Sequence, residues 1–455
     1  MAAIVSSVTG DSAATLDYSY DVDHNSRMDI LSRKKVTSLL TALTLLLSPV
    51  TAQASPLFNP HDAFYLPPAD LPATPGTLIR SAPAPDLQPQ DWPAATQRIL
   101  YSSTLITGEA AAVSGTLLEP TLPWNGPGPR PVLVIAPGTR GAADACAPSR
   151  GLISINAQTS ALGINYELPI AHLALLSGVR VVMTDYMGLG TPGAHTYAHN
   201  REEGRAVLDA ARVALRAADA PADTPVGLWG YSQGGGATGA AAELAATYAP
   251  ELNIAGTFAG APPANLPVVI NSIEGNAIFG VLGMAVAGFA ERNPVIFREE
   301  IEPLLNEEGR RYFDQTPEMC LPDAMLAWGR RHSRELTTTG ESFSEVAARS
   351  PILWEALTAQ NLGQTTPTGP VMIHAGTNDD TIPYHQVRDL AATYCASGVP
   401  VAYTTDPLPT TVPGTTLNHM LPFFSGMESS LTYLLERFRG APPRITATIY
   451  PIRPP

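Results

Sequence analysis

Lysine is almost absent from this sequence. Only Lys34 and Lys35 occur, and every other basic residue apart from histidine is an arginine. Schiff-base catalysis, phosphate binding by a P-loop and a Ser–Lys dyad each need a lysine amine. The chain beyond Lys35 therefore cannot carry any of these three chemistries.

Positive charge is scarce overall. The chain has 27 lysines and arginines against 41 acidic residues, a formal net charge of -14 at pH 7. A protein that binds nucleic acid needs a basic face for the phosphate backbone. The charge therefore argues against a nucleic-acid partner, and no sequence feature implies a protein partner.

Cysteine is limited to Cys146, Cys320 and Cys395, without a Cys-x-x-Cys motif. In an oxidising compartment we expect one disulfide and one leftover thiol, and spacing leaves all three pairings open. The His-x-x-x-His pair His195 and His199 lacks the adjacent glutamate of a zinc protease and follows a Gly/Pro loop. We expect no metal and no cofactor.

The two lysines lie in a segment that is typical of a secretion signal. Arg33-Lys34-Lys35 is a positive n-region, residues 39–47 form an apolar h-region, and Ala52-Gln53-Ala54 is a small-residue cleavage site. We expect cleavage after Ala54 and a secreted chain, extracellular or periplasmic. Met28 is a natural start, because the four aspartates before it do not belong in an n-region. The apolar run is short for a membrane span, but an uncleaved anchor stays open.

After the signal, residues 55–97 are rich in proline and predict an extended lead-in. Continuous apolar runs that alternate with helical patterns predict a mostly parallel sheet, covered by helices on both faces. The expected elements are a hairpin at 98–105 and 111–118, strands at 131–136, 179–185, 226–229, 254–259, 371–375 and 401–405, and helices at 203–217, 237–248 and 384–396.

One interval breaks this alternation. More than 100 residues separate the strands at 254–259 and 371–375, whereas a β-α-β unit needs about 30. Helical stretches at 276–291, 295–302 and 322–331 predict an inserted helical cap over 265–350, between core segments 98–264 and 351–455. The apolar run at 279–289 either packs inside the cap or lines an acyl pocket.

The segment 225–248 carries the strongest catalytic motif. An apolar run leads into Gly230-Tyr231-Ser232-Gln233-Gly234, and an Ala-rich helical pattern follows. This order of strand, sharp turn and helix exposes a serine hydroxyl, and the two glycines let strand and helix pass closely. G-x-S-x-G alone also occurs in plain turns, but the flanking elements favour Ser232 as a nucleophile.

A nucleophilic serine needs a base that an acid orients, and in this type of sheet the three arrive in the order Ser, Asp/Glu, His. Asp379 lies at the fourth position of a Gly-x-x-Asp that follows the strand at 371–375. Asp380 is its competitor, and either aspartate could instead cap the next helix. His419 is the only histidine beyond the last predicted strand, so we predict it as the base.

The oxyanion donors should be the backbone N–H of Gln233 and a second N–H from the loop after the strand at 131–136. That loop reads Pro137-Gly-Thr-Arg-Gly. Thr139 is the predicted donor and Arg140 the next candidate. A simple Pro–Gly turn remains the alternative for this loop.

Five segments together resemble the secretory lipase family, a bacterial and fungal group that includes the cap-bearing lipase A type. They are Pro137-Gly-Thr-Arg-Gly with Cys146-Ala-Pro-Ser downstream, Thr184-Asp-Tyr-Met-Gly-Leu-Gly-Thr-Pro-Gly, Gly230-Tyr-Ser-Gln-Gly-Gly, Ala259-Gly-Ala-Pro-Pro-Ala and Gly376-Thr-Asn-Asp-Asp-Thr-Ile-Pro. The resemblance covers roughly residues 64–438.

The resemblance implies an α/β-hydrolase fold with a helical lid and hydrolysis of carboxylic esters of the acylglycerol type. It implies Ser232, Asp379 and His419 as the triad, and it favours a Cys146–Cys320 disulfide. The chain departs from the family where Arg140 replaces an expected glutamine or acid. Cys395 also lacks the downstream partner that similar chains have.

We therefore expect a triacylglycerol lipase or esterase that works through an acyl-enzyme and contacts lipid interfaces. The same triad could transfer the acyl group to an alcohol or sugar, given a cap that excludes water. A non-catalytic lipid-binding protein on a hydrolase scaffold is disfavoured, because all three triad positions are filled. Peptide cleavage finds no support, since no propeller-like repeats or acidic recognition cluster are present.

Overall fold

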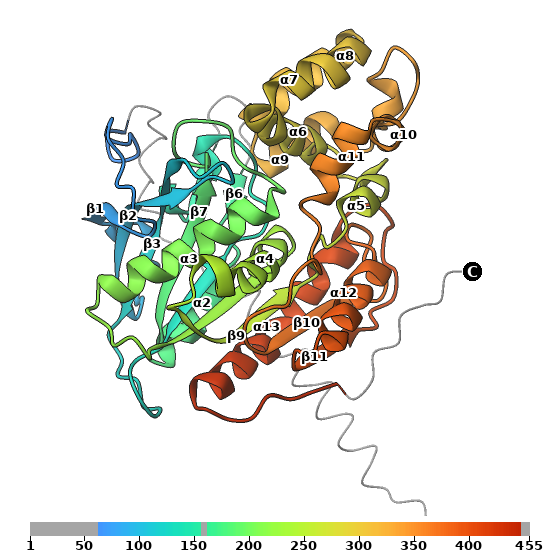
Figure 1. The fold of residues 1–455 in the computed structure, drawn as a ribbon. Coiled ribbons are helices and arrows are strands. Elements are labelled where there is room, and N and C mark those ends of the chain that lie inside the picture. The colour runs from blue at the N-terminus through green and yellow to red at the C-terminus, as the bar shows by residue number, and fades with distance from the viewer. Residues whose placement is uncertain (1–61, 156–161, 447–455) are drawn as a thin grey trace, which may run out of the picture. The chain divides into compact units, whose positions relative to one another are not determined.

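The computed structural model describes residues 62–155 and 162–446 (Figure 1). The predicted signal, the cleavage site after Ala54 and Met28 lie outside the described residues. Within the described ranges, every helix falls short of the length and apolarity that a membrane crossing requires.

A nine-stranded sheet organises the fold, in the order β1-β2-β3-β7-β4-β8-β9-β10-β11. The pairs from β1 to β7 are antiparallel, and those from β7 to β11 are parallel. The predicted hairpin, strands and mostly parallel sheet are confirmed. The strands are β1 (Leu78–Pro83), β2 (Ala94–Thr104), β3 (Ala110–Pro120), β4 (Val132–Ala136), β7 (Arg180–Met187), β8 (Pro225–Tyr231), β9 (Asn253–Gly260), β10 (Val371–Gly376) and β11 (Val401–Asp406).

Helices cover both faces of this sheet, because successive side chains of a strand point to opposite faces. On β4, Val132 and Val134 belong to the same apolar cluster as buried alanines of α3 (Asn200–Arg216) and α4 (Gln233–Tyr248). Leu133 and Ile135 belong to the cluster that contains α2 (Leu168–Leu176) and α13 (Leu417–Phe438). Every residue of β4 is buried, as its continuous apolar sequence predicts.

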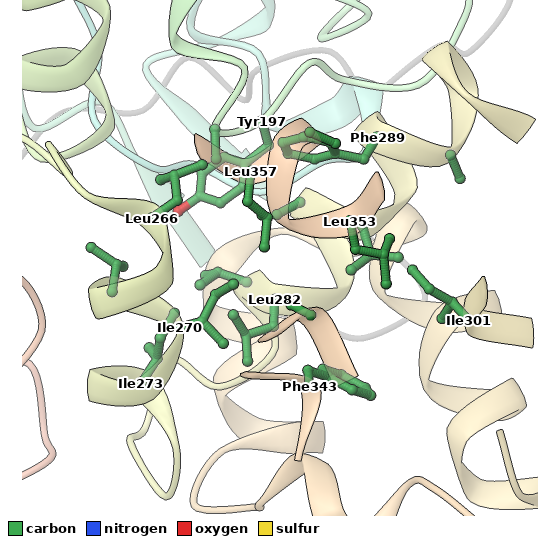
Figure 2. Close-up of a pocket in the computed structure, with 18 of the residues that line it drawn as sticks. Tyr197, Leu266, Ile270, Ile273, Leu282, Phe289, Ile301, Phe343, Leu353 and Leu357 are labelled. Atoms are coloured by element: carbon green, nitrogen blue, oxygen red, sulfur yellow. The ribbon is translucent and has the colours of Figure 1, made fainter. Parts of the chain in front are cut away.

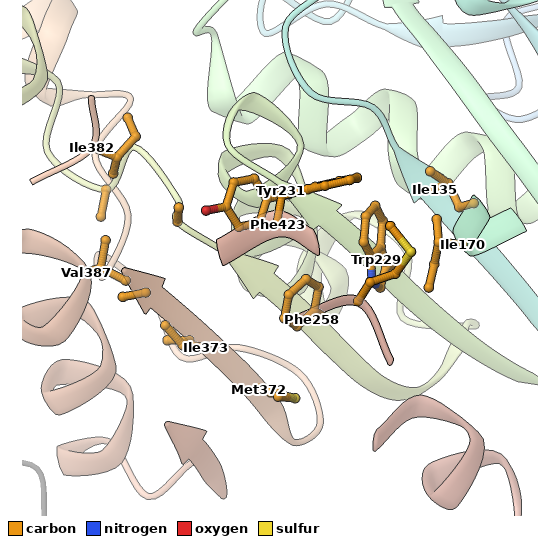
Figure 3. Close-up of a cluster of buried hydrophobic side chains, with 14 of the residues drawn as sticks. Ile135, Ile170, Trp229, Tyr231, Phe258, Met372, Ile373, Ile382, Val387 and Phe423 are labelled. Carbon is orange, nitrogen blue, oxygen red and sulfur yellow. The ribbon is translucent and has the colours of Figure 1, made fainter. Parts of the chain in front are cut away.

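Aromatic packing attaches α13 to the central strands (Figure 3). The Phe423 ring of α13 lies edge-on to Trp229 and Tyr231 of β8, with centroid distances of 5.9 and 5.4 Å. Trp229 also stacks on Phe258 of β9 at 5.6 Å and donates a hydrogen bond to Ser430 of α13. Each such aromatic pair adds about 1 kcal/mol beyond burial. The helix that follows β11 is thereby held beside the strand that leads to Ser232.

Seven α-helices lie between β9 and β10, and Figure 1 shows them gathered in one group, in yellow to orange. Their apolar side chains largely face one another and a shared cavity. The helices are α5 (Leu266–Ile273), α6 (Val281–Arg292), α7 (Pro294–Ile296), α8 (Glu307–Gln315), α9 (Leu321–Trp328), α10 (Phe343–Arg349) and α11 (Pro351–Thr358). After β10 comes α12 (Tyr384–Ala396), whose bounds are those predicted.

The structure differs from the prediction in two places. The proline-rich lead-in contains a strand, β1, which pairs with β2 at the edge of the sheet. An edge strand tolerates Pro83 because one side of its backbone needs no ladder partner. The second difference is α13, which was not among the expected helices: His419 lies in its first turn, and Pro422 lies inside it. Proline normally ends a helical pattern, so Pro422 weakens the helical signal of this segment.

Candidate functional site

Ser232 occupies a strained turn between β8 and α4. Its backbone has φ 58° and ψ -124°, a conformation that non-glycine residues rarely adopt. The Ser232 amide donates to Gly260 O at 2.9 Å, and its carbonyl accepts from Gly236 N at 3.0 Å. Bonds to β9 on one side and α4 on the other hold this conformation.

The glycines on either side of Ser232 have no room for a side chain. A Cβ on Gly230 would lie 2.1 Å from Gly234 O, and a Cβ on Gly234 would lie 2.0 Å from Ala136 O. Both distances are far inside van der Waals contact, and the obstructing atoms belong to the backbone. The close passage of strand and helix predicted from the motif is therefore present.

Ser232, His419 and Asp379 form a hydrogen-bonded chain. Ser232 Oγ lies 2.8 Å from His419 Nε2, and His419 Nδ1 lies 2.7 Å from Asp379 Oδ2. The other carboxylate oxygen of Asp379 accepts from the amides of Thr381 and Ile382 at 2.9 and 2.8 Å. The carboxylate can only accept, so Nδ1 carries the imidazole proton and Nε2 is free to accept the serine proton.

Asp380, the competing acid, has a different set of partners. Its Oδ2 accepts from the amides of Thr415 and Thr416 at 3.1 and 3.0 Å. Its backbone carbonyl accepts from Asn276 Nδ2 at 2.7 Å. Asp380 thus holds the turn that leads into α13 and makes no hydrogen bond to His419.

The predicted oxyanion residues Thr139 and Gln233 both line a cavity beside Ser232. In the described part of the chain, no oxygen atom accepts from the backbone N–H of either residue. The preceding amide, that of Gly138, is occupied, because it donates to Glu167 Oε1 at 2.8 Å. Thr139 and Gln233 therefore line the same cavity as Ser232, and neither backbone N–H has an oxygen partner among the described residues.

Arg140, the alternative donor, is used to build the loop. Its guanidinium forms a buried ion pair with Glu167 and stacks on Tyr166, 3.7 Å from the ring centroid. Burial lowers the pKa of Arg140 to about 10, so it remains charged at neutral pH. The same Glu167 that pairs with Arg140 accepts from Gly138, which ties the side chain of Arg140 to the shape of the loop.

The cavity leads from Ser232 into the helices between β9 and β10 (Figure 2). It encloses about 150 Å³, compared with the ~10–15 Å³ that one water needs. Most of its wall is apolar and comes from α5, α6, α10 and α11, and Figure 2 shows Ile270, Leu282 and Phe343 among the residues that line it. Such a wall suits a hydrocarbon chain far better than a polar ligand.

A disulfide links the loop after β4 to the insertion. Cys146 bonds to Cys320, which precedes α9, across 174 residues of sequence. Ala142 N donates to Met319 O at 3.0 Å, and Leu321 N donates to Arg140 O at 2.7 Å. The loop that contains Thr139 is therefore attached to the helical insertion by covalent and hydrogen bonds. Cys395, partly buried on α12, is a free thiol.

The sequence profile of the secretory lipase family matches residues 153–445. The chain belongs to the secretory lipase family. Among its relatives, this chain is 31% identical to a probable inactive lipase of Mycobacterium tuberculosis over 85% of this chain and 84% of that one. It is 27% identical to lipase A of Moesziomyces aphidis, over 91% and 89% of the two chains.

Solved structures agree with this assignment. Candida antarctica lipase A in its closed state superimposes with a TM-score of 0.70 at 26% identity, over 85% of this chain and 87% of that one. A rice cell wall degrading esterase from Xanthomonas oryzae superimposes with a TM-score of 0.65 at 22% identity, over 80% and 100%. The predicted α/β-hydrolase fold of this member of the family is confirmed.

Sequence reasoning missed the loop at 195–200, which borders the site between β7 and α3. Tyr197 Oη lies 3.0 Å from Thr139 Oγ1, and His195 Nε2 lies 3.0 Å from Gln233 Nε2. His199 instead packs against Phe289 of α6, with the ring centroids 4.0 Å apart and the ring planes tilted by 48°. The two histidines thus contact different partners rather than a shared centre. Their i, i+4 spacing was the only signal in the sequence.

His199 should make the protein sensitive to acid. Burial, with a contribution from nearby Arg292, lowers the pKa of His199 to about 3. In the unfolded chain His199 binds a proton below about pH 6.5, whereas in the folded protein it stays neutral down to about pH 3. The free energy of unfolding is therefore unaffected by His199 above pH 6.5 and decreases as the pH falls from 6.5 towards 3. Between pH 7 and pH 4.5, the free energy of unfolding should decrease by about 2 kcal/mol more in wild type than in His199→Phe, which has no titratable group at this position.

Urea unfolding at pH 7 and pH 4.5 measures this difference. His385→Phe serves as the control, because His385 is exposed on α12 and should lose as much stability on acidification as wild type. Equal losses in wild type and His199→Phe would contradict the prediction.

Proposed function

We propose that this protein is a secreted serine hydrolase that cleaves carboxylic esters, with triacylglycerols as its natural substrate class. Ser232 is the nucleophile, His419 the general base and Asp379 the residue that orients His419. The Thr139 and Gln233 amides form the oxyanion hole. The observation that carries the proposal is the Ser232–His419–Asp379 chain at the mouth of an apolar cavity.

The reaction follows from the positions of these groups. His419 Nε2 takes the Ser232 proton as Oγ attacks the ester carbonyl, and the two amides stabilise the negative oxygen. The imidazolium then protonates the leaving alcohol, and Asp379 stabilises its charge. Water, activated by the same histidine, hydrolyses the acyl-enzyme. The strained backbone of Ser232 keeps the hydroxyl exposed throughout these steps.

In this proposal the cavity binds the acyl chain. Its apolar wall begins beside Ser232 and continues between helices of the insertion, so a long chain could enter while its carboxyl end stays at the serine. The secretion signal at residues 33–54 and the family both favour an extracellular or periplasmic enzyme that meets lipid surfaces. No cofactor enters the mechanism.

A substitution in the cavity wall tests the acyl site. Ala285 of α6 lines the cavity, so the larger side chain of Ala285→Trp should fill part of the cavity and prevent a long acyl chain from entering. We expect hydrolysis of two- to four-carbon p-nitrophenyl esters to stay within a few-fold of wild type, and hydrolysis of twelve- to sixteen-carbon esters to fall by at least about tenfold, because each displaced methylene weakens binding.

Ala287→Trp is the matched control, because Ala287 lies on the same helix and is not among the lining residues. It should leave the chain-length profile unchanged. A uniform loss across all chain lengths in Ala285→Trp, or the same profile change in both variants, would refute the acyl site. Adding a primary alcohol to the assay shows whether the acyl group passes to an acceptor other than water.

A non-catalytic role is the second candidate, because one relative is a probable inactive lipase. That description belongs to the relative. In the present chain all three members of the hydrogen-bonded chain are in place. Lipid binding without any serine-dependent turnover would favour this second candidate.

A further inference from the structure

A buried carboxyl lies behind the nucleophile turn and takes no part in the mechanism above. Glu203, in the first turn of α3, is fully buried. Its Oε1 accepts from Gln233 Nε2 at 2.7 Å. Glu203 Oε2 has no hydrogen-bond partner among the described residues.

The side chain of Gln233 is held from two sides. Its Nε2 also faces His195 Nε2 at 3.0 Å, and His195 Nδ1 faces Met187 O at 3.2 Å. A carbonyl can only accept, so Nδ1 carries the proton and Nε2 accepts from Gln233. Gln233 thus uses both amide hydrogens, one on Glu203 and one on His195. A side chain fixed in this way restricts the rotation of its own peptide.

That peptide supplies one of the two oxyanion donors. The other donor residue, Thr139, contacts Tyr197 of the same 195–200 loop. The Glu203 carboxyl is connected to this loop through Gln233, whose side chain contacts His195 at the same time. One buried carboxyl is therefore linked to both structural supports of the oxyanion site.

We propose that Glu203 is a positioning residue that, through the Gln233 side chain and the 195–200 loop, holds the oxyanion amides towards the substrate oxygen. This inference rests on the proposed function and deepens it. Glu203 itself touches neither Ser232 nor the substrate.

The protonation state of Glu203 gives the proposal a distinctive signature. Burial raises the pKa of Glu203 to about 8, so the carboxyl is neutral at pH 7 and becomes anionic above pH 8. A negative charge behind the oxyanion site opposes the negative charge that develops in the transition state. The titratable and charged groups around Glu203 are Glu202 on its own helix, His195, Tyr197 and His199 in the loop, Tyr186 on β7, and Arg292 of α6, which pairs with Glu202.

The test compares kcat and KM for p-nitrophenyl butyrate from pH 6 to pH 10 in wild type and five variants, the first two of which change Glu203 itself. In wild type, kcat should fall roughly tenfold above about pH 8. Glu203→Gln keeps an oxygen that accepts from Gln233 but cannot ionise. Its kcat at neutral pH should stay within about threefold of wild type, and its kcat should no longer decrease above pH 8. Glu203→Ala should lower kcat by about 10- to 100-fold with little change in KM, less than direct loss of an oxyanion donor.

Gln233→Ala should reproduce the kcat loss of Glu203→Ala, and the double variant should be no slower than either single one, because both remove the same contact. Glu243→Gln is the matched control. Glu243 is also a largely buried carboxyl with a raised pKa, and it accepts a hydrogen bond from Tyr394. It lies ten residues after Gln233 on α4, about 15 Å along the helix from Gln233. Its substitution should leave the pH profile unchanged.

The outcomes separate the inference from the function on which it rests. An alkaline fall that persists in Glu203→Gln, or Glu203→Ala at wild-type kcat, would overturn the inference while wild-type turnover upholds the proposed function. Absence of turnover in wild type would overturn both. If Glu203→Ala fails to fold, the pH profile of Glu203→Gln still decides.

Discussion

Ser232→Ala should lose essentially all ester hydrolysis, with kcat reduced by about 10⁵–10⁶-fold. Alanine removes the only atom that can bond to the acyl carbon, while the binding cavity and the two amides remain. The remaining activity, a background set by substrate binding and the oxyanion site, should show no burst of acyl-enzyme. Hydrolysis of p-nitrophenyl butyrate and tributyrin measures the effect directly.

The fold of this variant should not suffer. Ser232 Oγ bonds only to His419, and the strained backbone is held by amide and carbonyl bonds that alanine keeps. The melting temperature should therefore stay close to that of wild type. A Ser232→Ala protein that is folded and fully active would remove Ser232 from the mechanism, and with it the proposed function.

Asp379→Asn should be the second-largest loss, about 10⁴-fold in kcat. The asparagine amide would donate a hydrogen bond to His419 Nδ1, so the imidazole proton would move to Nε2, where it faces Ser232. A protonated Nε2 cannot take the serine proton. The shape of the site changes little, so KM should stay within a few-fold of wild type, as a steady-state measurement on short-chain esters can check.

Asp380→Asn is the matched comparison for this experiment, because it makes the same chemical change at the neighbouring position. Its side-chain oxygen can still accept from the Thr415 and Thr416 amides, so kcat should stay within about tenfold of wild type. Loss of activity in Asp380→Asn with a functional Asp379→Asn would transfer the orienting role to Asp380.

Much of the sheet could be predicted because its strands are strongly patterned. A continuous apolar run such as that of β4 fits few structures other than a buried strand. The Gly-x-Ser-x-Gly turn requires its two glycines, because a Cβ at either position would overlap a backbone oxygen. The edge strand β1 was missed because its exposed residues and Pro83 carry no such pattern.

The supports around the site were harder to predict. Glu203 lies in the first turn of a helix, where acidic residues are common, and the neighbouring sequence does not indicate that its side chain is buried. Its contact with Gln233 joins α3 to α4 across 30 residues, and such a contact depends on the tertiary arrangement of the helices. Arg140 stood out only as a departure from the family, whereas its ion pair with Glu167 explains its presence in the loop.

The Cys146–Cys320 disulfide has a consequence for substrate entry. While the bond is intact, the two Cα atoms, now 5.5 Å apart, cannot separate beyond about 7 Å. The start of α9 therefore cannot move away from the loop after β4. A hinged opening of the whole insertion would pivot about this attachment, with displacements that grow with distance from α9, and reduction of the disulfide would release the pivot.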